Sequence, residues 1–87
     1  MWTVEWDESA RKEFRKLDHT AQQRIIKYLE ERIASRESPR RFGEGLTADK
    51  AGLWRYRVGD YRIVCKIEDR RLIVLVLRIG HRREVYE

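Results

Sequence analysis

Residues 53–64 constrain the fold of this chain more than any other segment, because they have the pattern of a tight β-hairpin. Gly59 and Asp60 form a two-residue turn, in which Gly59 accepts the positive φ of primed turns and Asp60 tolerates it better than most residues. Basic and apolar residues alternate on both sides of this turn. Successive side chains of a strand point to opposite faces, so the hairpin fixes which residues share a face.

Three arginines of the hairpin are predicted to lie together. Arg55 and Arg57 share one face of the first strand, while Trp54 and Tyr56 point to the other face and into a core. Arg62, just after the turn, joins the two arginines if it lies on the same side. Like charges side by side in a sheet repel one another. Their grouping therefore indicates a binding site for an anion.

The distribution of charge supports an anionic partner. The 87-residue chain has a net charge of +5. Lys and Arg outnumber Asp and Glu by only 11 to 10 in residues 1–50, but by 9 to 5 in residues 51–87. The excess lies in the part that is predicted to form most of the sheet, which favours nucleic acid as the partner.

Two amphipathic helices are predicted between a first strand and this hairpin. Residues 2–6 alternate apolar and polar side chains, which is typical of a half-buried strand. Asp7 is placed to cap the first helix, and Thr20 with Gln23 resembles a capping box that opens the second. Their short connection predicts an antiparallel helical hairpin. The apolar stripes are Ala10, Phe14 and Leu17 in the first helix, and Ala21, Ile25, Leu29 and Ile33 in the second.

The segment after the second helix reads as a loop, because it contains Pro39 and several glycines. Leu46 is predicted to insert into the core from this loop. The basic residues of the segment have two open interpretations, contact with an RNA backbone or simple exposure to solvent. These residues are Arg36, Arg40 and Arg41.

The remaining chain is predicted to be β-structure. After the hairpin and a turn at residues 68–70, residues 72–77 are apolar on both faces, as in a central strand, and Gly80 is expected to end it. We predict a single α+β domain over residues 1–87 with the order β-α-α-β-β-β. The helical hairpin packs on one face of a mostly antiparallel four-stranded sheet, and the arginines occupy the other face. The position of the first strand in the sheet stays open.

The sequence also predicts several absences. Cys65 is the only cysteine, which excludes an internal disulfide, and its mid-strand position favours a buried hydrophobe over a nucleophile. His19 and His81 are too far apart to suggest a metal site, and we expect no cofactor. Met1 leads directly into a patterned strand, so we expect neither a signal peptide nor a membrane span, and a cytoplasmic location.

Two motifs, taken with the order of elements, resemble the RelE toxins of toxin–antitoxin systems, within the RelE/ParE superfamily. They are Gly-Leu-Trp-Arg-Tyr-Arg-Val-Gly-Asp-Tyr-Arg-Ile-Val at 52–64 and Gly-His-Arg-Arg-Glu-Val-Tyr at 80–86. The resemblance spans nearly the whole chain. It implies a ribosome-dependent endoribonuclease that cuts mRNA in the ribosomal A site. The implied partners are the ribosome, mRNA and a cognate antitoxin that silences the toxin.

The resemblance also implies site residues. It places Arg55, Arg57, Arg62, Arg82 and Tyr86 at catalytic positions, and we add Arg83 to the candidate RNA-binding arginines. This chain differs from some members in having arginines at 55 and 57 in place of lysines. The spacing from Gly80 to Tyr86 is also shorter than in some members.

Metal-free RNA cleavage uses the 2′-OH of the RNA as nucleophile, so the enzyme must align it, stabilise the phosphorane and move two protons. We expect Arg55 and Arg62 to bind oxygens of the scissile phosphate and Arg57 to act electrostatically. Tyr86 is expected to stack on a base. Histidine is the side-chain type that titrates near neutral pH, so His81 is a candidate proton donor, with a turn or surface role as the alternative.

Two other functions are compatible with these observations. A ParE-like toxin, which poisons DNA gyrase without nuclease chemistry, would share the fold and the positive charge. A non-enzymatic RNA- or ribosome-binding module is the third reading. The arginines also have a purely structural interpretation, in which their aliphatic stems cover an open sheet face.

Overall fold

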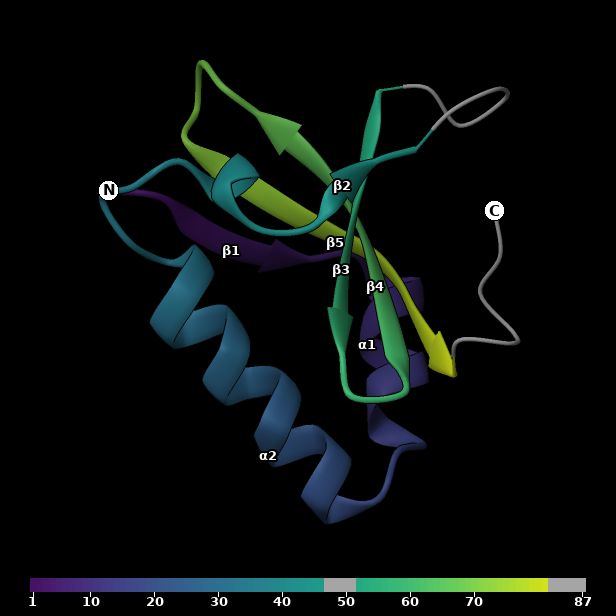
Figure 1. Ribbon diagram of the computed structural model, residues 1–87. Coiled ribbons are helices and arrows are strands. Elements are labelled where there is room, and N and C mark those ends of the chain that lie inside the picture. The colour runs from purple at the N-terminus through teal and green to yellow at the C-terminus, as the bar shows by residue number, and fades with distance from the viewer. Residues whose placement is uncertain (47–51, 82–87) are drawn as a thin grey trace.

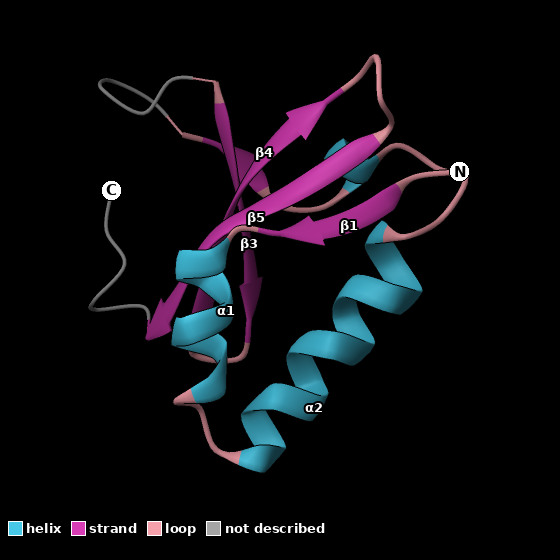
Figure 2. Ribbon diagram, turned by 180° about the vertical axis from the view of Figure 1, so that it is seen from behind, coloured by secondary structure: helices cyan, strands magenta, loops and turns pink. Residues whose placement is uncertain are grey.

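The protein is described by a computed structural model that covers residues 1–46 and 52–81. Two helices lie on the same side of one sheet (Figures 1 and 2). The helices are α1 (Glu8–Arg15) and α2 (His19–Tyr28), and the strands are β1 (Thr3–Trp6), β2 (Glu44–Gly45), β3 (Leu53–Val58), β4 (Tyr61–Glu68) and β5 (Ile73–His81). The predicted α+β architecture is confirmed. The sheet has five strands where four were predicted, because β2, inside the predicted loop, pairs with β3.

The strands are arranged in the order β1-β5-β4-β3-β2. The first strand takes an edge position, parallel to β5, whereas the other neighbours are antiparallel. β5 lies between β1 and β4 and is largely buried, as predicted for the central strand. The prediction that Gly80 ends this strand is wrong. β4 supplies partners as far back as Tyr61, so β5 continues through Gly80 to His81.

A carboxylate from α1 forms a hydrogen bond with the part of the β5 edge that β1 does not cover. β1 pairs with β5 only as far as Trp6 opposite Val76. Beyond that point the backbone N–H of Ile79 donates to Glu13 Oε1 at 2.8 Å, and Arg78 Nε contacts Oε2 of the same side chain at 3.2 Å. Glu13 therefore satisfies a strand donor that would otherwise be left without a neighbouring strand.

Both helices begin at aspartate caps. The Asp7 side chain caps α1 as predicted. The capping box predicted at Thr20 is wrong, because the Asp18 carboxylate accepts from the backbone N–H of Ala21 at 2.8 Å and starts α2 two residues earlier. α2 continues into a π-helical turn, Leu29–Ile33. No helix in the described ranges is long and apolar enough to cross a bilayer.

The main core lies between the helices and one face of the sheet. Cys65 is fully buried there, and burial raises the pKa of its thiol, which suits the predicted hydrophobic role. Trp2, Trp6 and Trp54 are half-buried against this core. The buried core residues are Ala10, Ile25, Leu29, Ile33, Tyr56, Val58, Ile63, Cys65, Val74, Val76 and Ile79.

The hairpin between β3 and β4 turns at Gly59, which has a φ of +59°. The φ of Asp60 is not positive, although Asp60 was expected to tolerate a positive value. A positive φ at the first central residue alone is the pattern of a type II′ turn, which matches the twist of the flanking strands.

The turn between β4 and β5 places Leu72 in the left-handed region, with a φ of +55°. Its N–H donates to the Asp69 carbonyl at 3.3 Å, and its carbonyl accepts from the N–H of Thr3 at 2.9 Å. These contacts hold the backbone in a conformation that is unfavourable for a bulky residue. Leu72 is 42% exposed, so its side chain gains little from burial.

Replacing Leu72 with Gly should therefore raise the free energy of unfolding by about 1 kcal/mol, because Gly adopts a positive φ without steric cost. Urea unfolding at an unchanged slope measures the difference. Leu72→Ala keeps the Cβ atom and should show no gain. An equal gain in both variants would trace the effect to the exposed side chain and contradict backbone strain.

Candidate functional site

Arg55, Arg57 and Arg62 lie on the face of the sheet opposite the helices. Arg57 in β3 pairs directly with Arg62 in β4, and Arg55 is two residues before Arg57 on the same face. Tyr56, between the two β3 arginines, is fully buried under the helices. The three arginines, with Gly43 and Glu44, line a cavity of about 290 Å³.

The cavity concentrates positive charge. Arg57 and Arg62 occupy directly opposed positions in an antiparallel pair, where like charges destabilise the sheet. The Arg55 side chain is only 19% exposed and forms an ion pair with Glu44. Guanidinium groups gathered in this way can hold an anion through several charge-assisted hydrogen bonds.

Glu44 is a site residue that the sequence analysis missed. It lies in β2 directly opposite Arg55, which puts the two side chains on the same face of the sheet. The chain can approach β3 this closely because Gly43 has a φ of +74° and no Cβ; a Cβ there would lie 2.3 Å from the Arg55 carbonyl oxygen. A glutamate between two glycines in a loop carries little signal, and only its register reveals its position.

Of the other residues predicted to be catalytic, only His81 lies among the described residues. Arg82 and Tyr86, like the RNA-binding candidate Arg83, lie outside the described residues. His81 pairs with Tyr61, and their ring centroids are 6.0 Å apart in an edge-on contact. Tyr61 packs against the helix-side core, so strand alternation directs His81 to the face opposite Arg62. The geometry does not support His81 as a proton donor in this cavity.

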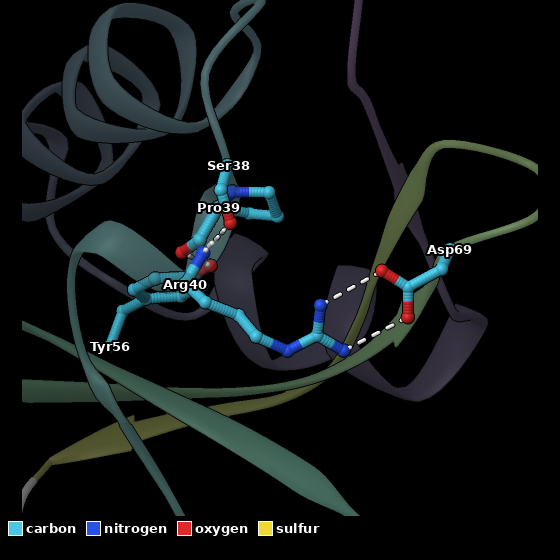
Figure 3. Close-up of polar contacts among 5 residues, drawn as sticks. All are labelled: Ser38, Pro39, Arg40, Tyr56 and Asp69. Carbon is cyan, nitrogen blue, oxygen red and sulfur yellow. Dashed lines mark hydrogen bonds and ion pairs between the residues drawn. The ribbon is translucent and has the colours of Figure 1, made fainter.

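Arg40, a candidate RNA-binding residue, is held by a bidentate ion pair. Its Nη1 and Nη2 atoms donate to the two carboxylate oxygens of Asp69 at 2.8 and 3.0 Å (Figure 3). The neighbouring Pro39 carbonyl accepts from the Tyr56 hydroxyl at 2.6 Å, and Ser38 caps this short 3₁₀ turn, Pro39–Arg41. The hydrogen bonds from Arg40 lower the pKa of Asp69 below its usual range.

The other two candidates of this segment differ in their surroundings. Arg41 Nη1 contacts Glu37 Oε1 at 3.0 Å, and its guanidinium lies 5.2 Å from the centre of the Phe42 ring. Arg36 is exposed. Arg40 and Arg41 are therefore each paired with a different carboxylate.

Leu46 does not insert into the main core as predicted. It is buried against Val64, with Leu53 half-buried beside them. Val64 shares a face with Arg62, so this small apolar cluster lies on the arginine face, next to the cavity. The cluster holds the end of β2 against β3, because the N–H of Leu46 also donates to the carbonyl of Leu53 at 3.0 Å.

A second concave surface, the helix-side groove, follows α2 on the other side of the molecule. One part lies between α1 and α2 and has a volume of about 500 Å³. The other lies between β1 and α2 and has a volume of about 330 Å³. Ile26 and Glu30 line both parts, which makes the groove continuous. Its apolar lining comes from Trp2, Val4, Trp6, Phe14, Ile26 and Leu29.

The model of a known protein family, the ParE toxin of the type II toxin–antitoxin system parDE, matches residues 4–86. The chain belongs to this toxin family. It is also 32% identical over 85 residues to Toxin RelG of Mycobacterium tuberculosis, a match that covers 98% of this chain and 95% of RelG. This toxin is thus a member of the RelE/ParE superfamily, and the resemblance inferred from its motifs is confirmed.

Solved structures of RelE toxins share the fold of this toxin. The toxin–antitoxin complex RelBE2 of M. tuberculosis aligns with a TM-score of 0.85 at 28% identity, covering 95% of this chain and 93% of the other. The isolated RelE toxin of E. coli aligns with a TM-score of 0.73 at 24% identity, covering 93% and 84%. The second likeness shows the fold alone.

Replacing Gly43 with Ala should lower the free energy of unfolding by about 2 kcal/mol or more, because the new Cβ meets backbone at a positive φ. Gly45→Ala, two residues further along the chain, is the matched control, since its Cβ would contact only the Trp54 ring at 3.4 Å. Urea unfolding of both variants measures the difference. Equal small effects would show that β2 does not depend on this close approach.

The ion pair of Arg40 with Asp69 should produce a pH-dependent contribution to stability. The pKa of Asp69 is lower in the folded protein, so the contribution is present above the ordinary aspartate pKa and is lost as the pH falls through the lowered value. Arg40→Met should be less stable than the unmodified toxin near neutral pH, with the difference vanishing in acid. Unfolding curves recorded from neutral to acid pH measure this difference in stability. A difference that does not change with pH would contradict the ionic origin.

Proposed function

We propose that this toxin is a metal-independent endoribonuclease that cleaves mRNA in the ribosomal A site and so inhibits translation. The observation that supports this function best is the convergence of Arg55, Arg57 and Arg62 on one cavity. Its volume of about 290 Å³ corresponds to roughly ten water molecules, which leaves room for a phosphodiester group. The similarity to RelE toxins in sequence and fold gives independent support.

The proposed chemistry uses the 2′-OH of the RNA as nucleophile and yields a 2′,3′-cyclic phosphate and a free 5′-OH. The extra negative charge of the phosphorane is the main barrier, and guanidinium groups are planar, bidentate and always protonated. Arg57 and Arg62 face each other across the strand pair and would bracket the phosphate. Arg55 would contact it from the side of β2. We further propose that Arg82 binds phosphate and that Tyr86 stacks on a base of the mRNA.

A cognate antitoxin is the second proposed partner, besides the ribosome and mRNA. RelBE2 of M. tuberculosis and RelBE of E. coli were both solved as toxin–antitoxin complexes. The helix-side groove offers an apolar surface that such a protein would cover, because its half-buried tryptophans and Ile26 remain accessible. A toxin that acts on translating ribosomes would work in the cytoplasm. The exposed Arg36 would add a peripheral contact to the RNA.

Inhibition of DNA gyrase is a second candidate function, favoured by the ParE description of the matching family model. The two functions separate when the toxin is induced without its antitoxin. Rapid loss of protein synthesis with new mRNA ends inside codons indicates the ribonuclease. Loss of DNA synthesis with gyrase–DNA adducts indicates the gyrase poison. Binding to ribosomes without either effect would indicate a non-enzymatic module.

Arg62→Ala should lower the rate of mRNA cleavage on programmed ribosomes at least 100-fold, since one donor to a developing oxyanion contributes about 3 kcal/mol. Primer extension maps the product ends, and circular dichroism verifies the fold. Arg71→Ala is the matched control, because Arg71 is exposed in a turn and pairs only with Glu68 among the described residues. Cleavage that survives in Arg62→Ala would exclude this cavity as the active site.

A further inference from the structure

The proposed reaction requires a base, and the three arginines of the cavity cannot supply one. The 2′-oxygen attacks phosphorus efficiently only if its proton is removed as the new bond forms. A guanidinium has a pKa above about 12 and no lone pair to accept a proton. His81 lies toward the opposite face of the sheet. Among the described residues, the proton acceptor must therefore be another side chain of the cavity.

Glu44 is the one acidic side chain among the described residues that line the cavity. Its position opposite Arg55 in the β2–β3 pair directs it to the arginine face. Its Oε2 atom contacts Arg55 Nη2, and the side chain is still 62% exposed. A carboxylate is thus held beside the guanidiniums and remains accessible to a bound RNA.

We propose that Glu44 is the general base of the cleavage, an inference that rests on the proposed ribonuclease function. The Glu44 carboxylate accepts the proton of the 2′-OH while the O2′–P bond forms. The P–O5′ bond then breaks, and the 5′-oxygen leaves with its electron pair and takes a proton from water. The products are a 2′,3′-cyclic phosphate and a 5′-OH. The proposed step uses no metal and no redox partner.

The local structure orients Glu44 for this role. The absence of a Cβ at Gly43 lets β2 lie directly on β3, which fixes the position of the next residue, Glu44. The ion pair with Arg55 then fixes the direction of the carboxylate. A base that is itself oriented by a hydrogen-bonded third group is the arrangement used to activate hydroxyl nucleophiles.

The same geometry allows a competing explanation, in which Glu44 occupies the place of the phosphate and is displaced when RNA binds. The charged groups that face Glu44 are Arg55 and Arg57 from β3 and Arg62 from β4, so either role is electrostatically favourable. The two explanations predict opposite results. Removing the carboxylate abolishes cleavage if it is the base, and improves binding and cleavage if it only competes with RNA.

The deciding experiment measures single-turnover cleavage of mRNA on programmed ribosomes by the full chain and by Glu44→Gln. We expect a loss of about 10²–10⁴-fold in the cleavage rate, the usual contribution of general-base catalysis, with ribosome binding unchanged or tighter. Glu68→Gln is the matched control. Glu68 is also ion-paired to an arginine, at 3.0 Å, but lies at the far end of β4 from Arg62.

A second pair of measurements separates a base from a residue that only positions Arg55. In the Arg55→Ala background, Glu44→Gln should lower the rate further, and the fall of the rate at acid pH should disappear with the carboxylate. No further loss in that background would show that Glu44 acts through Arg55 and would overturn the proposal. An unchanged or faster rate in the Glu44→Gln single variant would also overturn it.

Failure of this inference is distinguishable from failure of the proposed function. If the unmodified toxin cleaves mRNA on ribosomes and Glu44→Gln cleaves equally well, only the role of Glu44 is wrong. If the unmodified toxin cleaves no mRNA in the same assay, the ribonuclease function is wrong and the role of Glu44 is wrong with it.

Discussion

Turning the chain at Gly59 pairs Arg57 with Arg62 and Tyr56 with Ile63, and the surroundings of the candidate site depend on this register. The pairing sends Tyr56 and Ile63 into the core beneath the helices and the arginines to the opposite face. A shift by one residue would exchange the two sets and bury guanidinium groups without partners. The hydrophobic core therefore enforces the arrangement that gathers positive charge, although the clustered charges themselves oppose it.

A second constraint concerns β2, which is short and would not hold its place alone. The segment before it is attached to β3 by two aromatic residues, since Trp54 Nε1 donates to the Phe42 carbonyl at 2.7 Å and the Tyr56 hydroxyl donates to the Pro39 carbonyl. Leu46, just after it, packs on Val64. The cavity is thus completed by residues that are distant in sequence from the hairpin. Its geometry depends on how firmly this segment is attached.

The sequence predicted much of the candidate site because the relevant signal is local. Alternation around a two-residue turn is a property of adjacent residues, so the shared face of Arg55 and Arg57 was predictable. The same reasoning failed where the deciding contact is not local. Whether Gly80 ends its strand depends on how far β4 extends beside it, and whether Leu46 enters the main core depends on which face β2 covers. The capping box at Thr20 failed because Asp18 offers a competing cap nearby.

The sequence alone determined the α+β class, the order of the helices and main strands, and the grouping of basic residues around one turn, because periodicity and turn chemistry are encoded in neighbouring residues. Tertiary structure alone decided three other features. It placed β1 in parallel at the edge of the sheet, brought Glu44 beside Arg55, and directed His81 away from the cavity. Each of these depends on pairing between segments far apart in the chain. No local pattern specifies such a pairing, which is selected by the packing of the whole domain.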